Sequence, residues 1–297
     1  MTIKNLSEKL ALELVAEKKF HELIPGASPD DHFESTGIAS KGNNFLVVFS
    51  DTPHFARIDK SLTTGHGSNC LFRNMGKTTG YQDVTYDGRG QRFLALTEAT
   101  KQGDSSNLPR INQFNTDLGY IEGRFIDYDV KGNDRILRGI AAIWRADQLS
   151  ILAICKDNNC RGGKEGQTPG GGQIHVFQPE AGMWGRKESI RLPKDLPFRD
   201  FVSLEVRGNR LVILSQASSA IWIGTLQDSG WGFIDDGIIY DLPLGKKDKV
   251  RYCSVEGIAW VDDNRVAVIS DRQHSRRPNK SCAKRDQSIH VFDLPAG

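Results

Sequence analysis

The chain has 297 residues, of which 38% are hydrophobic and 26% charged, a composition that excludes disordered and collagen-like classes. The 39 Lys and Arg residues nearly balance the 37 Asp and Glu residues, so a net charge of +2 excludes bulk attraction to nucleic acid or membrane. The N-terminus lacks the apolar segment of a signal peptide, and we expect a soluble, cytoplasmic protein. The five cysteines are odd in number and few, which favours reduced thiols over a disulfide scaffold.

The first elements along the chain are a short helix and a strand. Residues 6–19 place Leu6, Leu10 and Leu14 on one helical stripe, so residues 1–18 are expected to form a short helix or arm. Its other face carries both charge signs, which favours packing on the protein over membrane anchoring. The segment Lys19–Pro25 matches the pattern of Glu188–Pro193 and is predicted to be a strand.

A two-strand unit then recurs along the whole chain. The distance from Gly37 to Ser50 is thirteen residues, and so is the distance from Gly257 to Ser270. Five such copies begin near residues 37, 84, 139, 202 and 257, which gives steps of 47, 55, 63 and 55 residues. Repeats of this length are typical of propeller blades. The sequence therefore predicts one all-β domain over residues 1–297, a five-bladed β-propeller, with six blades as the alternative.

The last repeat leaves too few residues for a fourth strand, because the given sequence ends at Gly297. The predicted strand Lys19–Pro25 can supply it by pairing beside Ser288–Leu294. Closing the ring with strands from both ends would remove an exposed sheet edge, which is a hazard in β proteins.

Carboxylates recur where the repeat predicts one mouth of the propeller. The innermost strand of each blade begins, and the second strand ends, on the same face, so residues at both positions should meet there. Converging carboxylates repel one another unless a cation neutralises them, and oxygen ligands suit Ca²⁺. The alternative is that these side chains bond the amides of their own turns. The candidate metal ligands are Glu256, Asp83, Asp271, Asp51, Glu98 and Asp157.

Two long loops follow the second strands of the third and fifth repeats, at residues 157–172 and 271–287. Between Arg272 and Arg285 the second loop has six Lys or Arg residues, one His and no acid. Such a run is either a solvated face or a clamp for phosphate or carboxylate, which Arg binds in bidentate fashion. Histidines in mouth-side loops are candidates for proton transfer. The candidate substrate-binding residues are Arg138, Arg272, Arg276, Arg277 and Lys280, and the candidate catalytic residues are His54 and His274.

Several other features carry weaker signals. His175 and His290 occupy matching third-strand positions and are expected to be residues within the sheet. Cys155, Cys160 and Cys282 could meet if the two long loops touch, but the spacing Cys-x4-Cys is unusual for zinc. The sequence contains no nucleophile-elbow, metalloprotease or dinucleotide-binding motif.

The segment Glu256–Ala259, echoed by Thr36–Ala39 and followed in both copies by Ser-Asp, resembles a diffuse group of propellers. This group includes phytase-like, gluconolactonase-like and SdiA-regulated domains. The resemblance implies Ca²⁺ at the mouth, with Glu256 as first ligand and Asp271 as second, and hydrolysis of phosphate or lactone esters. Those relatives usually have six blades.

Two functions remain open from the sequence. The first is a Ca²⁺-assisted hydrolase that acts on a phosphorylated or carboxylated small molecule at the mouth. The second is a non-catalytic propeller that binds a protein or small ligand across the same face. A propeller fold hosts both uses and does not decide between them.

Overall fold

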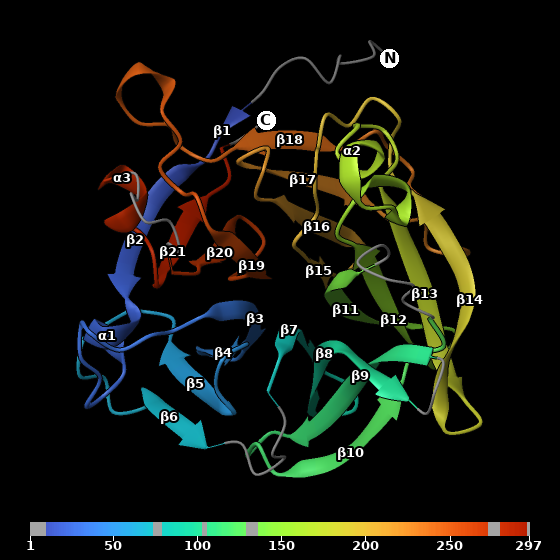
Figure 1. The fold of residues 1–297 in the computed structure, drawn as a ribbon, viewed down its shortest axis with the longest axis horizontal. Coiled ribbons are helices and arrows are strands. Elements are labelled where there is room, and N and C mark those ends of the chain that lie inside the picture. Colours follow the sequence, from blue (N-terminus) through green and yellow to red (C-terminus); the bar gives the residue numbers. More distant parts are fainter. Residues whose placement is uncertain (1–9, 74–78, 103–105, 129–135, 273–279, 296–297) are drawn as a thin grey trace.

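The computed structural model describes residues 10–73, 79–102, 106–128, 136–272 and 280–295. Their strands form five sheets arranged in a ring, as Figure 1 shows, and the prediction of a five-bladed β-propeller is confirmed. Among these residues no helix is long and apolar enough to span a membrane.

The first three blades are each built from four consecutive antiparallel strands. Blade 1 contains β3 (Ser35–Lys41), β4 (Asn44–Phe49), β5 (His54–Asp59) and β6 (Cys70–Arg73). Blade 2 contains β7 (Tyr81–Asp87), β8 (Arg92–Gln102), β9 (Ser106–Asn115) and β10 (Tyr120–Phe125). Blade 3 contains β11 (Leu137–Arg145), β12 (Gln148–Cys155), β13 (Gln173–Glu180) and β14 (Met183–Arg191).

The last two blades each take a strand from the N-terminal segment. Blade 4 contains β15 (Ser203–Arg207), β16 (Arg210–Ser215), β17 (Ala220–Thr225) and β18 (Ile238–Asp241), with β1 (Leu10–Ala11) parallel to β18. Blade 5 contains β19 (Val255–Trp260), β20 (Arg265–Ser270), β21 (Ser288–Asp293) and β2 (Glu13–Lys19). Short helices are α1 (Phe20–Leu23), α2 (Gly163–Gly166), α3 (Lys280–Ala283), η1 (Asn158–Cys160) and η2 (Lys246–Asp248).

The ring is closed by an N-terminal strand, as expected, but by different residues. The closing strand is Glu13–Lys19 and not Lys19–Pro25, and the residues expected to be helical are therefore strands over 10–11 and 13–19. The apolar side chains of Phe20 and Leu23 are instead buried between blades 5 and 1 by the helical turn α1. Their spacing of three residues puts both side chains on one face of a helical turn, where both pack into the core, whereas a strand would point them to opposite faces.

Hydrophobic side chains fill the spaces between neighbouring blades. Five buried clusters occur, one for each pair of adjacent blades around the ring. Ile174 of blade 3, for example, belongs to the same cluster as Trp222 of blade 4. Burying one large apolar side chain contributes about 1.5–3 kcal/mol, so these clusters are the main source of the stability of the ring.

The innermost strands β3, β7, β11, β15 and β19 lie nearest the centre in Figure 1 and approach one another closely. A Cβ atom on Gly37 would lie 2.6 Å from the Cα atom of Asp83, and one on Gly139 would lie 2.8 Å from the Cα atom of Ser203. The glycines of the repeat are therefore required by close contact of the blades.

Candidate functional site at the mouth of the propeller

The mouth is the face on which the innermost strands begin and the second strands end. Four of the five innermost strands start with a register shift typical of a β-bulge. A bulge adds one residue to the strand and re-aims its side chain. The residues skipped at these shifts are Thr36, Gln82, Arg138 and Glu256.

Side chains from four blades form one hydrogen-bonded chain here, which we call the mouth network. Arg138 donates to Gln82, and its Nη2 atom lies 3.4 Å from Oε2 of Glu256. The other oxygen of Glu256 accepts a 3.0 Å hydrogen bond from Gln216. Gln82 in turn donates a 2.8 Å hydrogen bond to Glu98.

Arg138 and Glu256 are the charged pair at the centre of this network. Their side chains are 21% and 13% exposed, so the pair is largely withdrawn from water yet still reachable. Burial raises the pKa of Glu256, against the opposing effect of the Arg138 and Lys156 charges. The buried Nε atom of Arg138 has no hydrogen-bond partner among the described residues, so the guanidinium keeps an unused donor.

Asp83, expected to face Glu256 across the mouth, lies deeper in the ring. Its register position corresponds to Gly257, and Gln82 occupies the place that corresponds to Glu256. Asp83 is 1% exposed, and its oxygens accept hydrogen bonds from Val84 N, Ile140 N and the Ser203 hydroxyl. Complete burial raises the pKa of Asp83 well above its usual value, and the three donors oppose that effect. Through these hydrogen bonds the Asp83 side chain connects blades 2, 3 and 4.

A second buried carboxylate, Glu205, follows Ser203 on β15 and was not singled out in the sequence. It is 8% exposed, and its Oε2 atom has no hydrogen-bond partner among the described residues. Burial raises its pKa well above the usual value, and the negative charge of Asp83 adds to the effect. The strand register places Glu205 at the position that holds Ala39, Ala141 and Ala259 in other blades, whereas the thirteen-residue spacing of the repeat aligns Leu204 there, so the sequence alignment misses it.

The remaining candidate carboxylates lie apart, around the rim. Asp51 follows β4, and its pKa is raised by partial burial and by the nearby charge of Glu34. Asp157 precedes η1 and forms an isolated β-bridge with Asp200 of the segment leading into blade 4. Asp271 accepts a hydrogen bond from the amide of Arg272. The contact of Asp271 is of the turn-bonding kind, and the metal-ligand roles of all three carboxylates stay a prediction.

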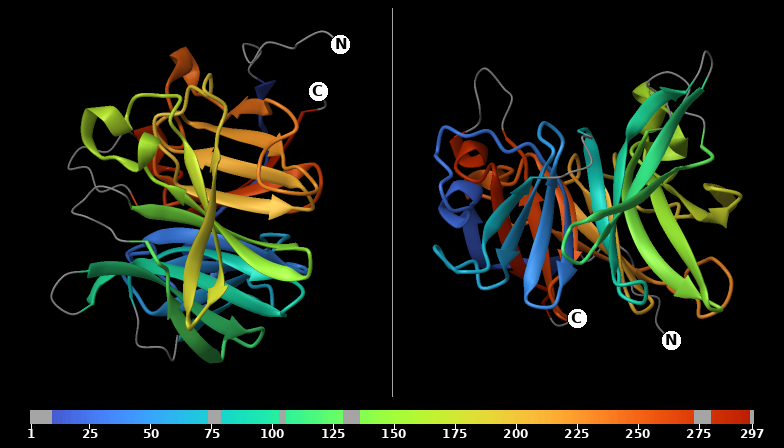
Figure 2. Two further views of the ribbon diagram at one scale, coloured as in Figure 1. Left: turned by 90° about the vertical axis from the view of Figure 1, so that its right-hand side faces the viewer. Right: turned by 90° about the horizontal axis from the view of Figure 1, so that it is seen from below.

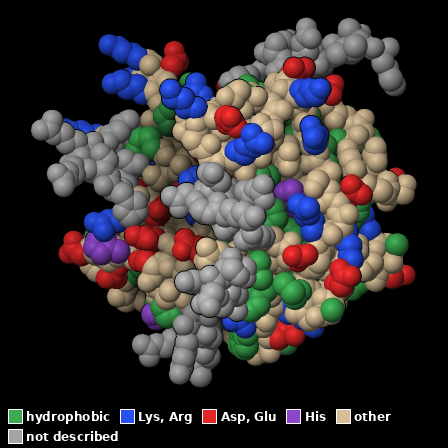
Figure 3. Space-filling view, turned by 45° about the vertical axis from the view of Figure 1, so that its right-hand side comes forward, with side chains coloured by type: hydrophobic (Ala, Val, Ile, Leu, Met, Phe, Trp, Pro, Cys, Tyr) green, Lys and Arg blue, Asp and Glu red, His purple; other side chains and the backbone are tan. Residues whose placement is uncertain are grey.

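Apart from Arg138, the candidate basic and histidine residues are divided between the rim and the undescribed segment. Nη1 of Arg272 lies 3.2 Å from Nε2 of His32, and Lys280 is exposed at the start of α3. His54 begins β5, where its ring contacts the Thr52 hydroxyl. The calls on His274, Arg276 and Arg277 fall outside the described residues. The face drawn in Figure 3 carries both charge signs interspersed, so selectivity for an anion must come from individual side chains.

A metal site requires several donor atoms that lie close together. Within the described part of the chain, one group of potential metal ligands is found: the donor atoms of Cys155, Cys160 and His175 lie within 4.8 Å of one another. The six candidate carboxylates do not form such a group there, and Ca²⁺ binding stays a prediction.

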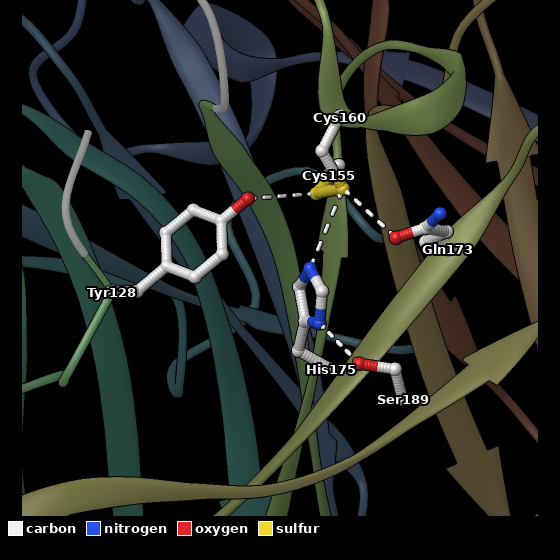
Figure 4. The surroundings of a disulfide bond; sticks show 6 residues. All are labelled: Tyr128, Cys155, Cys160, Gln173, His175 and Ser189. Atoms are coloured by element: carbon white, nitrogen blue, oxygen red, sulfur yellow. Dashed lines mark hydrogen bonds between the residues drawn. A yellow bond between two sulfur atoms is a disulfide. The ribbon is translucent and has the colours of Figure 1, made fainter. Parts of the chain in front are cut away.

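Four of the five cysteines are paired, contrary to the expectation of reduced thiols. Cys155 pairs with Cys160 across a Cα–Cα distance of 5.2 Å, and Cys253 pairs with Cys282 across 5.5 Å, while Cys70 is free. Figure 4 shows the first disulfide with His175 and Tyr128 beside it. Cys160 reaches Cys155 through a short turn, and Cys282 reaches Cys253 from a separate loop. The number of cysteines in the sequence shows neither contact. Disulfides are typical of oxidising compartments, which counts against the predicted cytoplasmic location.

Comparison with known proteins identifies a fold but no family. No protein-family model matches the chain, and no curated protein matches it. Glutaminyl cyclase from Myxococcus xanthus is 10% identical, over 97% of this chain and 100% of its own, with a TM-score of 0.53. Aldose sugar dehydrogenase from Streptomyces coelicolor is 11% identical, over 94% and 98%, with a TM-score of 0.48. Calcium-binding regucalcin from Agrobacterium tumefaciens is 10% identical, over 98% and 92%, with a TM-score of 0.48.

At these identities the likeness shows the fold alone. The resemblance to phytase-like, gluconolactonase-like and SdiA-regulated domains is therefore supported only as far as the propeller fold, and no family is shown. Function has to be argued from the mouth itself.

Proposed function

We propose that this propeller binds a small anionic molecule, a carboxylate or phosphate, on the Arg138–Glu256 pair at its mouth. The observation that carries the proposal is this ion pair, which is largely withdrawn from water and in which the buried Nε of Arg138 has no hydrogen-bond partner among the described residues. A guanidinium offers several N–H groups in a fixed plane and favours anions that accept two hydrogen bonds.

The protonation state of Glu256 controls the binding of an anion by Arg138. Its ionised form compensates the charge of Arg138, and its neutral form leaves that charge available to a ligand. Because burial raises the pKa of Glu256, the neutral form is reached closer to physiological pH than for an exposed glutamate.

Hydrolysis of the bound molecule is the second candidate function. It is favoured by the same raised pKa, because a carboxyl group that is neutral closer to neutral pH can act as a general acid beside a bound ester. Glu256 replaces the histidines as the candidate proton-transfer residue in this proposal. Ca²⁺ is not required, since both oxygens of Glu256 and both oxygens of Asp83 already accept hydrogen bonds.

The test is a melting-temperature screen of the full chain against small mono- and dicarboxylates, sugar phosphates and inorganic phosphate. At least one anion should raise the melting temperature in a concentration-dependent manner. Incubation of that anion's esters with the protein then decides between binding alone and hydrolysis. A screen in which no anion stabilises the protein up to millimolar concentration would contradict the proposal.

A further inference from the structure

The disulfide of blade 3 lies in a cluster of metal-ligand side chains. Cys155 ends β12 and is fully buried, Cys160 lies on η1 and is 6% exposed, and His175 in the middle of β13 is 3% exposed. Their donor atoms all lie within 4.8 Å of one another. Two cysteines and a histidine are the ligand types that Zn²⁺ prefers in proteins.

The histidine ring is held in the orientation that ligation needs. Its Nδ1 atom lies 2.8 Å from the hydroxyl of Ser189 on β14, and Nε2 lies 3.4 Å from Sγ of Cys160. Two ligands of one tetrahedral zinc ion, a nitrogen and a sulfur, are about 3.5 Å apart. A partner on the far ring nitrogen is the usual support of a zinc-binding histidine.

Either of two nearby oxygen atoms can supply the fourth ligand. The hydroxyl of Tyr128 lies 3.3 Å from Sγ of Cys155, and Oε1 of Gln173 lies 3.7 Å from Sγ of Cys160 (Figure 4). The cluster therefore presents two sulfurs and a nitrogen within 4.8 Å of one another, with one oxygen atom near each sulfur.

Blade 5 contains a similar arrangement in which, among the described residues, no cysteine is grouped with the histidine as a metal ligand. Tyr252 packs on His290 at 4.9 Å, as Tyr128 packs on His175 at 5.0 Å. Ser270 holds the place of Cys155 at the end of the second strand and bonds Nε2 of His290 at 2.8 Å. Cys282 pairs with Cys253 and is not among the metal-ligand group found in the described chain. This blade is a matched internal control.

We propose that reduction of the Cys155–Cys160 disulfide converts this cluster into a Zn²⁺ site. A dithiol reductant gives two electrons and two protons to the disulfide and becomes a cyclic disulfide, which leaves two cysteine thiols. Zn²⁺ then replaces the two thiol protons, which pass to solvent, and His175 supplies the nitrogen ligand through Nε2. The site is separate from the mouth network and does not depend on the proposed function.

Cobalt binding to the full chain tests the proposal. The protein is reduced with a phosphine, freed of reductant without oxygen, and titrated with Co²⁺. Reduced protein should bind one equivalent with the visible absorption of tetrahedral, thiolate-ligated Co²⁺, Zn²⁺ should displace it, and oxidised protein should show no such band. Cys160→Ser and His175→Phe should each lose the tetrahedral band, and the double variant Cys253→Ser/Cys282→Ser should keep it.

Thiol alkylation gives a second readout that needs no variant. In the reduced wild-type protein, Zn²⁺ should slow alkylation of Cys155 and Cys160 at least tenfold and leave the rates at Cys253 and Cys282 unchanged, as measured by peptide mass spectrometry. Equal rates at Cys155 and Cys160 with and without Zn²⁺ would overturn the proposal. A cobalt band that survives in Cys160→Ser, or disappears in the Cys253→Ser/Cys282→Ser variant, would overturn it as well.

Discussion

Ser203 of blade 4 donates a 3.0 Å hydrogen bond to Oδ2 of Asp83 of blade 2, across the centre of the ring. The same oxygen accepts the amide of Ile140 in blade 3, and Oγ of Ser203 accepts the amide of Ile258 in blade 5. One carboxylate and one hydroxyl thus connect four blades, where the innermost strands are too close for larger side chains.

Asp83→Ala should therefore destabilise the protein strongly. The change leaves two backbone amides and a hydroxyl without their acceptor, and each unsatisfied buried group costs about 1–3 kcal/mol. Chemical denaturation should show a loss of about 3 kcal/mol or more. Asp51→Ala is the control, because Asp51 lies near Glu34 at the rim and its removal relieves repulsion. Equal stability of the two variants would mean that the central hydrogen bonds do not support the ring.

The buried Glu205 predicts a particular pH dependence of stability. Its folded-state pKa is raised, so the folded protein holds a proton that the unfolded chain has lost above about pH 4.3. The stability is therefore fully present below that pH and falls as the pH rises through the folded pKa. Glu205→Gln should reduce the decline in unfolding free energy that begins above about pH 4.3.

The matched control for this experiment is Glu180→Gln. Glu180 is exposed and forms a surface ion pair with Lys187, so its replacement should leave the pH profile unchanged. Parallel profiles for the wild-type protein and Glu205→Gln would show that Glu205 does not titrate abnormally.

The N-terminal closure is tested by two neighbouring apolar residues. Leu12, between β1 and β2, is 2% exposed and packs between blades 4 and 5, whereas Val15 on β2 is 50% exposed. Leu12→Ala should cost about 2–5 kcal/mol of unfolding free energy, and Val15→Ala should change it by less than about 0.5 kcal/mol. A Leu12→Ala variant with the unfolding free energy of the wild-type protein would indicate that the ring is closed elsewhere.

The sequence predicted the blades better than the site. The period of the repeat and the hairpin turns identify five blades, because alternation and turn residues are local signals. The closing strand was misplaced by six residues, because the prediction followed the match of Lys19–Pro25 to Glu188–Pro193 and not the three-residue spacing of Phe20 and Leu23, which is helical. Both side chains pack between blades 5 and 1.

The side chains that line the mouth are selected by the register of the innermost strands, and the sequence alone does not show that register. A bulge places Gln82, not Asp83, beside Arg138, and a shift of one residue moves a side chain from the mouth to the interior. The disulfides were missed for a similar reason. Cys160 reaches Cys155 through a turn in which both Asn159 and Cys160 adopt positive φ, a conformation that no motif announces.

Anion binding at the mouth should weaken as the pH rises. Ionisation of Glu256 compensates the charge of Arg138, so the dissociation constant of an anion should increase as the pH passes upward through the raised pKa of Glu256. Glu256→Gln should bind the same anion more tightly at neutral pH and remove this dependence. If the dissociation constant has the same pH dependence in the variant as in the wild-type protein, Glu256 does not control binding. Titration calorimetry at several pH values measures both effects.

The most direct test of the central claim is the affinity of the best anion from the screen for wild-type, Arg138→Gln and Arg89→Gln proteins, measured by titration calorimetry. Arg89 is an exposed arginine paired with Asp147 in a hairpin loop away from the mouth network. If Arg138 holds the ligand, Arg138→Gln should weaken binding at least about tenfold, a loss of about 1.4 kcal/mol, with the fold intact. Arg89→Gln should bind like the wild-type protein. Wild-type affinity in Arg138→Gln, or equal losses in both variants, would contradict the assignment of the mouth as the binding site.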